Sequence, residues 1–454
     1  MFQVMKNAWK VKEIRQKILY TVLILIIFRL GCAIMAPFVD TAALSTWVAE
    51  NSEGNIISYM NMLSGGALSR ATIFSLSISP YINAQIIMQL LTYALPPLER
   101  LSKEGEEGRK KINFISTVLA LVIAVFTSFA YYLTMKNTMR TADGKSVLEY
   151  TNGGFEEIFS MICIMFIFVA GASLIIWLGG LIDEKGIGNG ISMILLAGII
   201  SRYPVTIYNL IKLMISEDTR ADYVFAVPLV FVLYIAIIVF IVFMNNAERR
   251  IPIQYAKRVI GRKQYGGQNT HIPIKVCMSG VLPIIFAMSF MQLPSTIELF
   301  VPRYDYPNGF GQKFYNGFLD FFNSQSIGYA ILYFLLIIGF NYFYVSMQYN
   351  PTEIANNLRQ NNGGIPGIRP GKPTSDFIQR VLSKITLFGA FFLGIIAVFP
   401  ILFSKLMTDA FGLAQLSTIS MGGTSILIVV SVALETTRTL ESQMMMRHHK
   451  GFLE

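Results

Sequence analysis

The chain has 454 residues, of which 54% are hydrophobic and only 14% are charged, and its formal net charge is +10. Soluble domains carry about a quarter charged residues, so this composition excludes an ordinary soluble domain and indicates a membrane protein. Stretches of about 20 apolar residues are long enough to cross the hydrocarbon core of a bilayer as helices.

Ten such stretches follow one another along the chain. They lie near residues 18–38, 72–98, 112–135, 155–182, 188–214, 223–246, 274–297, 326–349, 378–407 and 412–436. The fifth is the least regular, because Arg202 and Pro204 interrupt it. Backbone polar groups must find partners inside lipid, so we predict an all-α polytopic membrane protein with ten transmembrane helices.

The passage NMLSGGALSRATIFSLSISPYINAQIIMQLL, residues 61–91, joins a short glycine-containing segment to the second span. The part near 57–70 is too short and too weakly apolar to cross a membrane. The span behind it carries polar residues at near-helical spacing, which predicts one wettable face. These residues are Ser75, Ser79, Asn83 and Gln89. For any single one of them, a helix–helix hydrogen bond that holds the bundle together is the simpler interpretation.

Lysine and arginine gather in alternate connections, which is typical of cytoplasmic loops and predicts that both termini are cytoplasmic. Two of these loops, near 246–275 and 350–378, are long for simple connectors. Their concentrated positive charge favours an anionic partner, such as lipid headgroups, RNA or an acidic protein surface. The basic residues of interest are Arg250, Lys257, Arg258, Arg262 and Lys263 in the first loop and Arg369 in the second.

The predicted spans lack the groups that coupled transport or catalysis requires. No Asp, Glu, Lys or His lies near the middle of any span, and Arg29 lies toward the outer half of the first. Ion-coupled carriers need an ionisable group at membrane depth. The sequence also has no HExxH, no phosphate-binding glycine loop and no GxSxG motif. We therefore expect neither an enzyme nor a metal or cofactor site.

Five motifs in order along the whole chain make it similar to the SecY family of protein-conducting channels. They are SGGALSRATIFSLSISPYINAQIIMQLL, DEKGIGNGISMIL, RRIPIQYAKR, PGIRPGKPT and GGTSILIVV. The resemblance implies an hourglass of two pseudo-symmetric five-helix halves, residues 1–217 and 218–454. It also implies that the segment near 57–70 is a plug, which includes Ser64, Gly65, Gly66, Ala67, Leu68, Ser69 and Arg70. One departure is Ser420 and Met421, where many relatives have an aromatic residue before the last motif.

The resemblance further implies three groups of site residues. A ring of aliphatic side chains that seals the pore corresponds to Ile78, Ile82, Ile191, Leu195, Ile285 and Ile428. Spans two and seven flank a lateral gate. The polar residues of this gate and of the interior correspond to Asn83, Gln89, Asn189, Ser289, Gln292 and Thr424. The two basic loops correspond to docking sites for the ATPase SecA and for the ribosome.

The function implied is that of a channel subunit in the cytoplasmic (inner) membrane. It would translocate unfolded preproteins with a signal sequence and release hydrophobic segments sideways into the membrane lipids. The implied partners are the SecE and SecG subunits, SecA and the ribosome. Two alternatives remain at this point. One is a secondary transporter for a small solute, with a site on the helices interrupted near Pro80 and Pro283. The other is a scaffold without transport activity.

Overall fold

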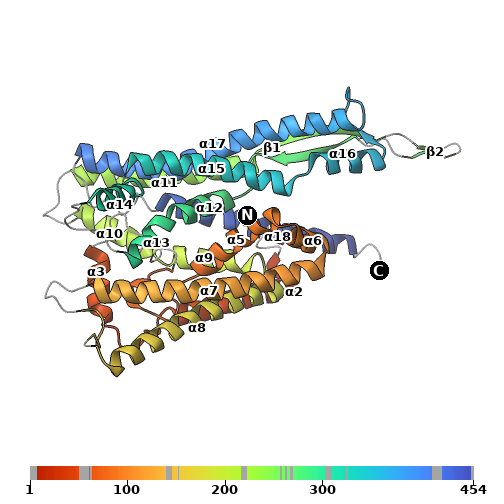
Figure 1. Ribbon diagram of the computed structural model, residues 1–454. Helices are drawn as coiled ribbons and strands as arrows, with labels where there is room; N and C mark the ends of the chain where they lie inside the picture. Colours follow the sequence, from red (N-terminus) through yellow and green to blue (C-terminus); the bar gives the residue numbers. More distant parts are fainter. Residues whose placement is uncertain are drawn as a thin grey trace.

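The computed structural model of the chain describes residues 8–50, 61, 64–139, 146–151, 153–215, 222–255, 258–260, 263–265, 269–301, 309–323, 326–411 and 422–450. The molecule is a bundle of long helices that run side by side (Figure 1). Strand β1 and helix α16 project beyond the bundle at one end, with β2 at the tip of the projection. Helices α3, α10 and α14 lie at the opposite end.

In the described residues, the regular elements of the N-terminal part are all helices. These are α2 (Lys12–Gly31), α3 (Thr41–Glu50), the 3-10 helix η1 (Leu68–Arg70), α5 (Ser79–Ala94), α6 (Pro96–Lys103), α7 (Glu106–Asn137), α8 (Phe155–Lys185), α9 (Gly190–Ile200) and α10 (Tyr203–Ile215).

The C-terminal part adds strands between its helices. Its elements are α11 (Asp222–Asn246), β1 (Glu248–Tyr255), β2 (Arg258–Ile260), β3 (Lys263–Tyr265), β4 (Asn269–Lys275), α12 (Leu282–Met291), α13 (Leu293–Phe300), α14 (Phe310–Phe321), α15 (Ile327–Gln348), α16 (Pro351–Gln360), β5 (Gly363–Gly364), α17 (Lys372–Phe411) and α18 (Gly422–Lys450).

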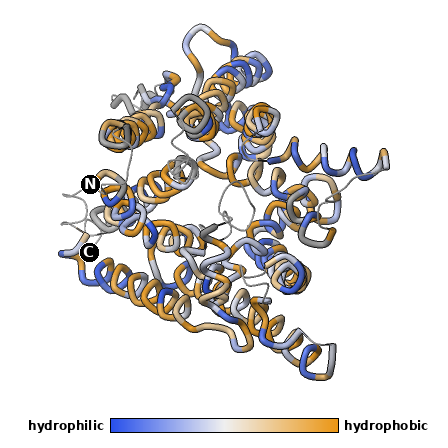
Figure 2. The backbone as a smooth tube through the Cα atoms, turned by 90° about the vertical axis from the view of Figure 1, so that its left-hand side faces the viewer, coloured by the Kyte–Doolittle hydropathy of each residue, from blue (hydrophilic) through white to orange (hydrophobic). Residues whose placement is uncertain are grey.

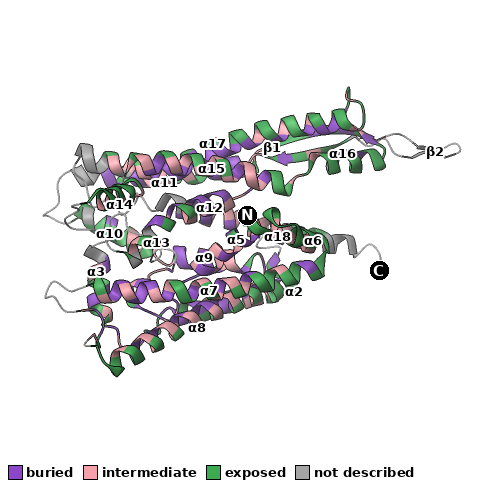
Figure 3. Ribbon diagram, in the orientation of Figure 1, coloured by how far each residue is buried: buried purple, intermediate pink, exposed green. Residues whose placement is uncertain are grey.

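Many outer surfaces of the bundle are apolar. Among the described residues, six helices are long and apolar enough to cross a membrane: Glu106–Asn137, Phe155–Lys185, Gly190–Lys212, Phe225–Asn246, Ile327–Gln360 and Lys372–Phe403. Large apolar side chains on them, such as Phe126, Phe166 and Phe243, are exposed. Figure 2 looks along the bundle and shows hydrophobic residues on the helices at its rim. Figure 3 shows exposed residues along the outer faces of α7, α8 and α17. Contiguous exposed apolar surface of this extent indicates contact with lipid.

The second expected span becomes helical later than predicted. Residues 73–78 form turns, and α5 begins only at Ser79, with Pro80 in its first turn. Ser75 Oγ donates to the carbonyl oxygen of Thr72 at 2.6 Å, and Ser77 has a φ of 53°. A serine side chain bonded to nearby backbone competes with helix formation. Proline then suits the first helical positions, because it needs no hydrogen-bond acceptor there.

Two further expected spans are broken in their interiors. The fifth span consists of α9 and α10, which are separated at Ser201 and Arg202, just before Pro204. The seventh span begins at Leu282 and divides at Gln292 into α12 and α13, before Pro294. Proline cannot donate the hydrogen bond that a helix interior requires, so each break falls near one.

A small antiparallel sheet joins the two basic loops, and the sequence analysis did not predict it. Its strand order is β4-β1-β5, and β2 and β3 form a separate hairpin beyond it. In the register, Glu248 faces Lys275 and Gln254 faces both Asn269 and Gly364. Ile251 and Ile253 are buried on one face of β1, where they pack with residues of α16 and α17 such as Leu358 and Ile378. The projecting end is therefore a packed unit with its own core.

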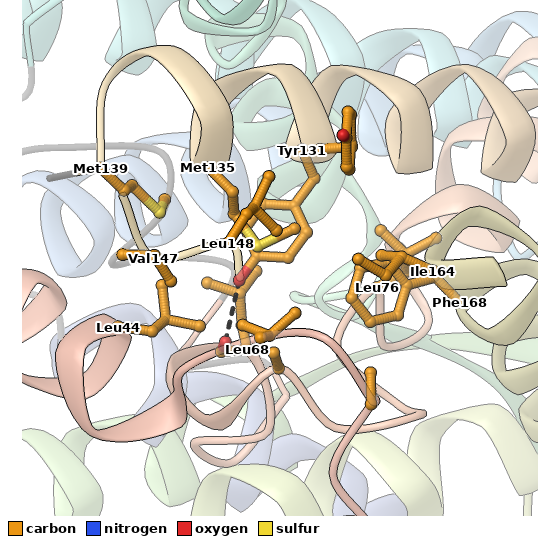
Figure 4. Close-up of a cluster of buried hydrophobic side chains, with 14 of the residues drawn as sticks. Leu44, Leu68, Leu76, Tyr131, Met135, Met139, Val147, Leu148, Ile164 and Phe168 are labelled. Atoms are coloured by element: carbon orange, nitrogen blue, oxygen red, sulfur yellow. Dashed lines mark hydrogen bonds between the residues drawn. The ribbon is translucent and has the colours of Figure 1, made fainter. Parts of the chain in front are cut away.

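The bundle has three main hydrophobic cores. The first, the N-terminal core, contains residues between 36 and 172, including Leu44, Leu68, Tyr131 and Phe168 (Figure 4). The second, the C-terminal core, contains buried residues between 241 and 427. The third, which we call the shared core, draws buried residues from positions 24–199 and from Ile428 and Val432 of α18. Its contacts join the two parts of the chain.

Candidate functional site

All six residues predicted to form the aliphatic ring belong to the shared core. Ile78, Leu195 and Ile428 are buried in it, and Ile82, Ile191 and Ile285 are half-buried against it. They come from the start of α5 and from α9, α12 and α18. The structure therefore brings together side chains that are up to 350 positions apart in the sequence.

Local sequence fixes how α5 and α9 present these side chains. Ile78 and Ile82 lie one turn apart at the beginning of α5, as do Ile191 and Leu195 on α9, and residues four apart project from one face of a helix. The two pairs therefore each present a continuous apolar edge to the shared core.

A close approach of backbones sets the position of α9 against α8. A Cβ atom added to Gly190 would overlap the carbonyl oxygen of Gly179. A Cβ atom added to Gly179 would lie 2.7 Å from Cδ1 of Ile191. At the same turn, Asp183 Oδ1 accepts a hydrogen bond from the Gly190 amide at 2.7 Å. The glycines let α9 lie close enough to α8 for Ile191 to reach the shared core.

The segment Ser64–Arg70, which we call the plug segment, fills space between the N-terminal and shared cores. Leu68 is fully buried in the first core and Ala67 is buried in the shared core. Tyr131 Oη donates to the Leu68 carbonyl oxygen at 3.0 Å (Figure 4). Arg29 Nη1 donates to the Gly65 carbonyl oxygen at 3.4 Å. These contacts hold the segment through its backbone as well as its side chains.

The plug segment contains no regular α-helix. It consists of turns followed by one 3-10 helix, and residues 57–60, 62 and 63 of the expected plug lie outside the described residues. Gly65 and Gly66 have φ values of +65° and +89°. These left-handed conformations stop a regular helix, and only glycine adopts them without strain.

The predicted polar gate residues have different environments. Asn83, Gln89, Ser289 and Gln292 are half-buried, whereas Asn189 is exposed. The side chain of Asn189 caps α9, because its Oδ1 accepts a hydrogen bond from the Ser192 amide at 3.0 Å. We expected a polar contact across the interior from this residue. The side chain of Thr424 lies outside the described residues.

Besides the shared core, helices from the two parts of the chain meet along a seam that involves α5, α7, α13 and α15. Within the N-terminal part, α5 packs against α7. Across the seam, α13 of the C-terminal part contacts α7. Near the end of α5, the ring of Tyr93 makes an edge-to-face contact with Phe343 of α15, with 5.7 Å between ring centroids. The seam therefore runs between α5 and α7 on one side and α13 and α15 on the other.

The sheet brings the two basic loops into one surface. Arg369 is exposed in the connection between β5 and α17, and its carbonyl oxygen accepts a hydrogen bond from Thr374 Oγ1 at 2.8 Å. Arg250 is exposed on β1, where its Nε lies 2.7 Å from Glu248 Oε1. Arg258 and Lys263 lie on β2 and β3, but their side chains are not described. Lys257 and Arg262 lie outside the described residues.

One arginine that the sequence analysis did not select links α18 to α11. Arg438 Nη2 donates to the Asn245 carbonyl oxygen at 2.6 Å and to Asn246 Oδ1 at 3.1 Å. A cation that binds the free carbonyl groups at a helix C-terminus is favourable. Burial lowers the pKa of nearby Lys275, and the positive charge of Arg438 lowers this pKa further. A lone arginine near the end of a span carries no signal of this role in the sequence.

The described residues of the site provide apolar packing and hydrogen bonds. In the described part of the chain, no group of three or more His, Cys, Asp or Glu side chains is arranged to hold a metal ion. The three cysteines are free, and Cys32 and Cys277 are buried.

Comparisons with known proteins agree with this arrangement. The family model described as SecY matches residues 72–437. The protein translocase subunit SecY of Mycobacterium tuberculosis strain H37Rv is 38% identical over 453 residues, which cover 99% of each chain. The protein of the same name from Thermotoga maritima is 38% identical over 463 residues, covering 100% of this chain and 98% of the relative.

Solved structures resemble the fold. A structure described as that of a protein conducting channel has a TM-score of 0.61 and 17% identity, and covers 94% of this chain and 92% of the other. Sec61 in a canine ribosome-channel complex has a TM-score of 0.57 and 15% identity, with the same coverage of both chains.

Proposed function

Because the chain belongs to the SecY family and is a multi-pass channel subunit of a protein translocase, we propose that the six aliphatic residues of the shared core form the seal of its pore. Unfolded secretory polypeptides would pass through this seal across the cytoplasmic membrane. The observation that carries the proposal is that Ile78, Ile82, Ile191, Leu195, Ile285 and Ile428 share one hydrophobic cluster between two otherwise separate cores. Membership of this family also decides against a small-solute transporter and against an enzyme.

Aliphatic side chains suit a seal for physical reasons. They offer no hydrogen bonds to a passing chain, so they bind no particular sequence. A narrow apolar neck also tends to lose its water, which resists the leakage of ions. Residues 1–217 and 218–454 would be the two halves of the hourglass, and the shared core lies where they meet. A small separation of the halves would therefore widen the ring.

The plug segment would close the pore beside this ring. The side chains of Tyr131 and Arg29 each donate one hydrogen bond to its backbone. Hydrogen bonds of this kind contribute about 1 kcal/mol each to stability. A passing polypeptide that supplies equivalent apolar contacts would displace the segment at modest cost.

The seam between α5, α7, α13 and α15 would be the lateral gate. Helix α5 carries the half-buried amides Asn83 and Gln89, and the half-buried Ser289 and Gln292 lie on α12 and directly before α13. Polar pairs within a bilayer contribute about 0.6–2 kcal/mol each, which suits a seam that opens and closes again. A hydrophobic segment would then partition into lipid according to its apolar area, at about 25 cal/mol per Å².

The sheet and its basic loops would face the cytoplasm, as would both termini. Arg250 and Arg369 are exposed there and would contribute to docking of SecA and of the ribosome. The relative in the canine complex is a ribosome-bound channel, which supports the second partner. SecE and SecG would complete the assembly, and the energy for transport would come from SecA or from the ribosome.

Ion conductance of the purified protein in planar bilayers tests the plug and the seal together. We expect the wild type to be silent and a variant lacking residues 57–70 to leak, and a silent deletion variant would contradict the proposal. Because Ala67 and Leu68 are buried, the deletion also removes core contacts. Gly65→Ala is therefore a second variant, since its Cβ would lie 2.7 Å from the Gly198 carbonyl oxygen. Gly66→Ala is the control, because its φ is similar but its nearest atom, in Arg202, is 3.8 Å away. We expect more leakage from Gly65→Ala than from Gly66→Ala.

A further inference from the structure

Helix α14 presents three different faces. Four phenylalanines, Phe310, Phe314, Phe318 and Phe321, fall within an arc of about 80° when about 100° is counted per residue. Their side chains are 88%, 67%, 39% and 45% exposed. A second face carries the exposed charges of Lys313 and Asp320.

The third face attaches α14 to the bundle. Leu319 on this face is buried. Tyr315 Oη donates to the carbonyl oxygen of Val301, the residue that follows α13, at 2.5 Å. Phe318 stacks at a tilt on Phe322, with 4.8 Å between centroids, and Phe322 packs against the C-terminal core. The phenylalanine stripe therefore projects from a helix that is fixed in place.

The surroundings of α14 in the chain are lipid-facing. Immediately after it, α15 carries the exposed stripe Ile327, Ile331 and Leu335, at a spacing of four residues. The ring of Phe321 occupies the space that a Cβ atom on Gly328 would need, so it lies against the first turn of α15. The end of α14 is thus continuous with a span that faces lipid. Figure 1 shows α14 at the end of the bundle opposite the sheet.

The size of the stripe argues against a stable protein partner. A phenylalanine side chain buries about 150–250 Å², so four rings with these exposures offer about 500 Å². Stable protein–protein interfaces bury about 800 Å² on each partner. An interfacial helix needs less, because phenylalanine enters the boundary between headgroups and acyl chains while charged residues remain in water.

We propose that α14 is a membrane anchor that inserts its phenylalanine stripe into the interfacial region of the leaflet at this end of the bundle. Through Tyr315 and Phe321 it fixes the ends of α13 and α15 relative to the lipid surface. The inference depends on the position and faces of α14 and does not rest on the proposed transport function.

Fluorescence quenching in vesicles of phosphatidylethanolamine and phosphatidylglycerol tests the anchor. The starting protein is the full-length chain with Cys32, Cys163 and Cys277 replaced, so that one new cysteine carries an environment-sensitive fluorophore. Phe314→Cys places the probe on the stripe, and Lys313→Cys, one residue earlier, is the matched control. We expect lipid spin-labelled near the headgroup to quench the probe at 314 more than aqueous iodide does, and the order to reverse at 313.

Two outcomes overturn the proposal. Stronger quenching by iodide than by spin-labelled lipid at 314 would show that the stripe faces water. Protection from both quenchers at 314, lost when the protein is diluted in lipid, would show instead that a second copy of the chain covers it. If the replacement of Cys32 or Cys277 impairs insertion, only the half-buried Cys163 is replaced. Burial then protects Cys32 and Cys277 from the fluorophore.

Discussion

Arg369 is the basic residue whose environment best fits a contact with an anionic partner. It is exposed beyond β5, and the bond from Thr374 to its carbonyl oxygen fixes its backbone rather than its guanidinium group. A guanidinium group offers a planar fork of donors to carboxylate or phosphate, which a lysine cannot reproduce. A folded loop that leaves this group accessible therefore favours binding over a structural role.

We predict that Arg369→Glu abolishes SecA-driven translocation of a precursor into vesicles, because it replaces an attractive charge with a repulsive one. Arg369→Lys should retain only part of the activity. The control is Arg359→Glu, which reverses an exposed arginine on neighbouring α16 and should translocate at nearly the wild-type rate. Membrane insertion and assembly should be normal in all three variants. Normal translocation by Arg369→Glu would contradict the docking role.

The motifs predicted the packing of the aliphatic ring residues better than the hydrogen bonds of the polar gate residues. Ile78 and Ile82 lie in the shared core with Ile191 and Leu195, because spacing of four along a helix keeps each pair on one face. Asn189 Oδ1 caps the helix that it begins, a local contact that the motif did not predict, and its expected contact across the interior stays a prediction. An asparagine before a helix has a local partner available at little entropic cost, and local caps compete with longer-range contacts.

At the scale of elements, the contact of α8 with α9 positions the pair Ile191 and Leu195 of the aliphatic ring. Gly179 lies under Ile191, whereas its neighbour Gly180 has no heavy atom within 4 Å of the position of a Cβ. The same substitution can therefore be made at two adjacent glycines of one helix, and only the packing around the new methyl group differs.

We predict that Gly179→Ala destabilises the protein by about 1–3 kcal/mol, because the added methyl group overpacks against Ile191. Gly180→Ala should be neutral or stabilising by up to about 1 kcal/mol, since alanine is the better helix former. Thermal unfolding in detergent measures the stability of both variants. Unfolding is detected by the reaction of the buried Cys32 and Cys277 with a thiol-reactive dye. Equal stability of the two variants would show that the contact does not constrain α9.

The sheet is the element that pattern reasoning overlooked, although the sequence RRIPIQY of β1 alternates in burial. Its partner β5 is only two glycines long and more than 100 residues away in the chain. A strand this short gives no periodic signal, and its pairing depends on the packing of α16 and α17 beneath it. The two basic loops consequently form one surface.

For the molecule as a whole, the proposed lateral gate requires the two halves to separate along the seam between α5–α7 and α13–α15. Tyr93 and Phe343 lie across it, with ring centroids 5.7 Å apart. A similar pair, Phe334 and Phe391, joins α15 to α17 within the C-terminal part, with centroids 5.6 Å apart. A cross-link at the first pair would join the two sides of the seam, and a cross-link at the second pair would join two helices on the same side.

We predict that a short cross-link between Tyr93→Cys and Phe343→Cys blocks precursor translocation and the release of hydrophobic segments, because the halves can no longer part. A reducible linker should restore transport on reduction. The same linker between Phe334→Cys and Phe391→Cys should leave transport unchanged. Unimpaired transport with the first link formed would refute a gate at this seam.

Composition and periodicity settled those properties that depend on transfer from water to lipid. Apolar runs of span length predicted a polytopic helical bundle, because transfer free energy adds up residue by residue along the chain. The uneven placement of lysine and arginine predicts cytoplasmic termini, which stays a prediction. Motifs in order predicted the family. Pro204 also marked the place where the fifth span breaks, whereas the break before Pro294 was not predicted.

Folding in three dimensions decided the rest. The sheet between distant loops, the link from Arg438 to the end of α11 and the backbone-held plug segment all depend on groups that are far apart in sequence. The phenylalanines of α14 are periodic, but only the burial of Leu319 shows which face is left for lipid. Hydrogen bonds and close packing require particular atoms to meet, and their meeting depends on the whole chain's path rather than on the composition of any one segment.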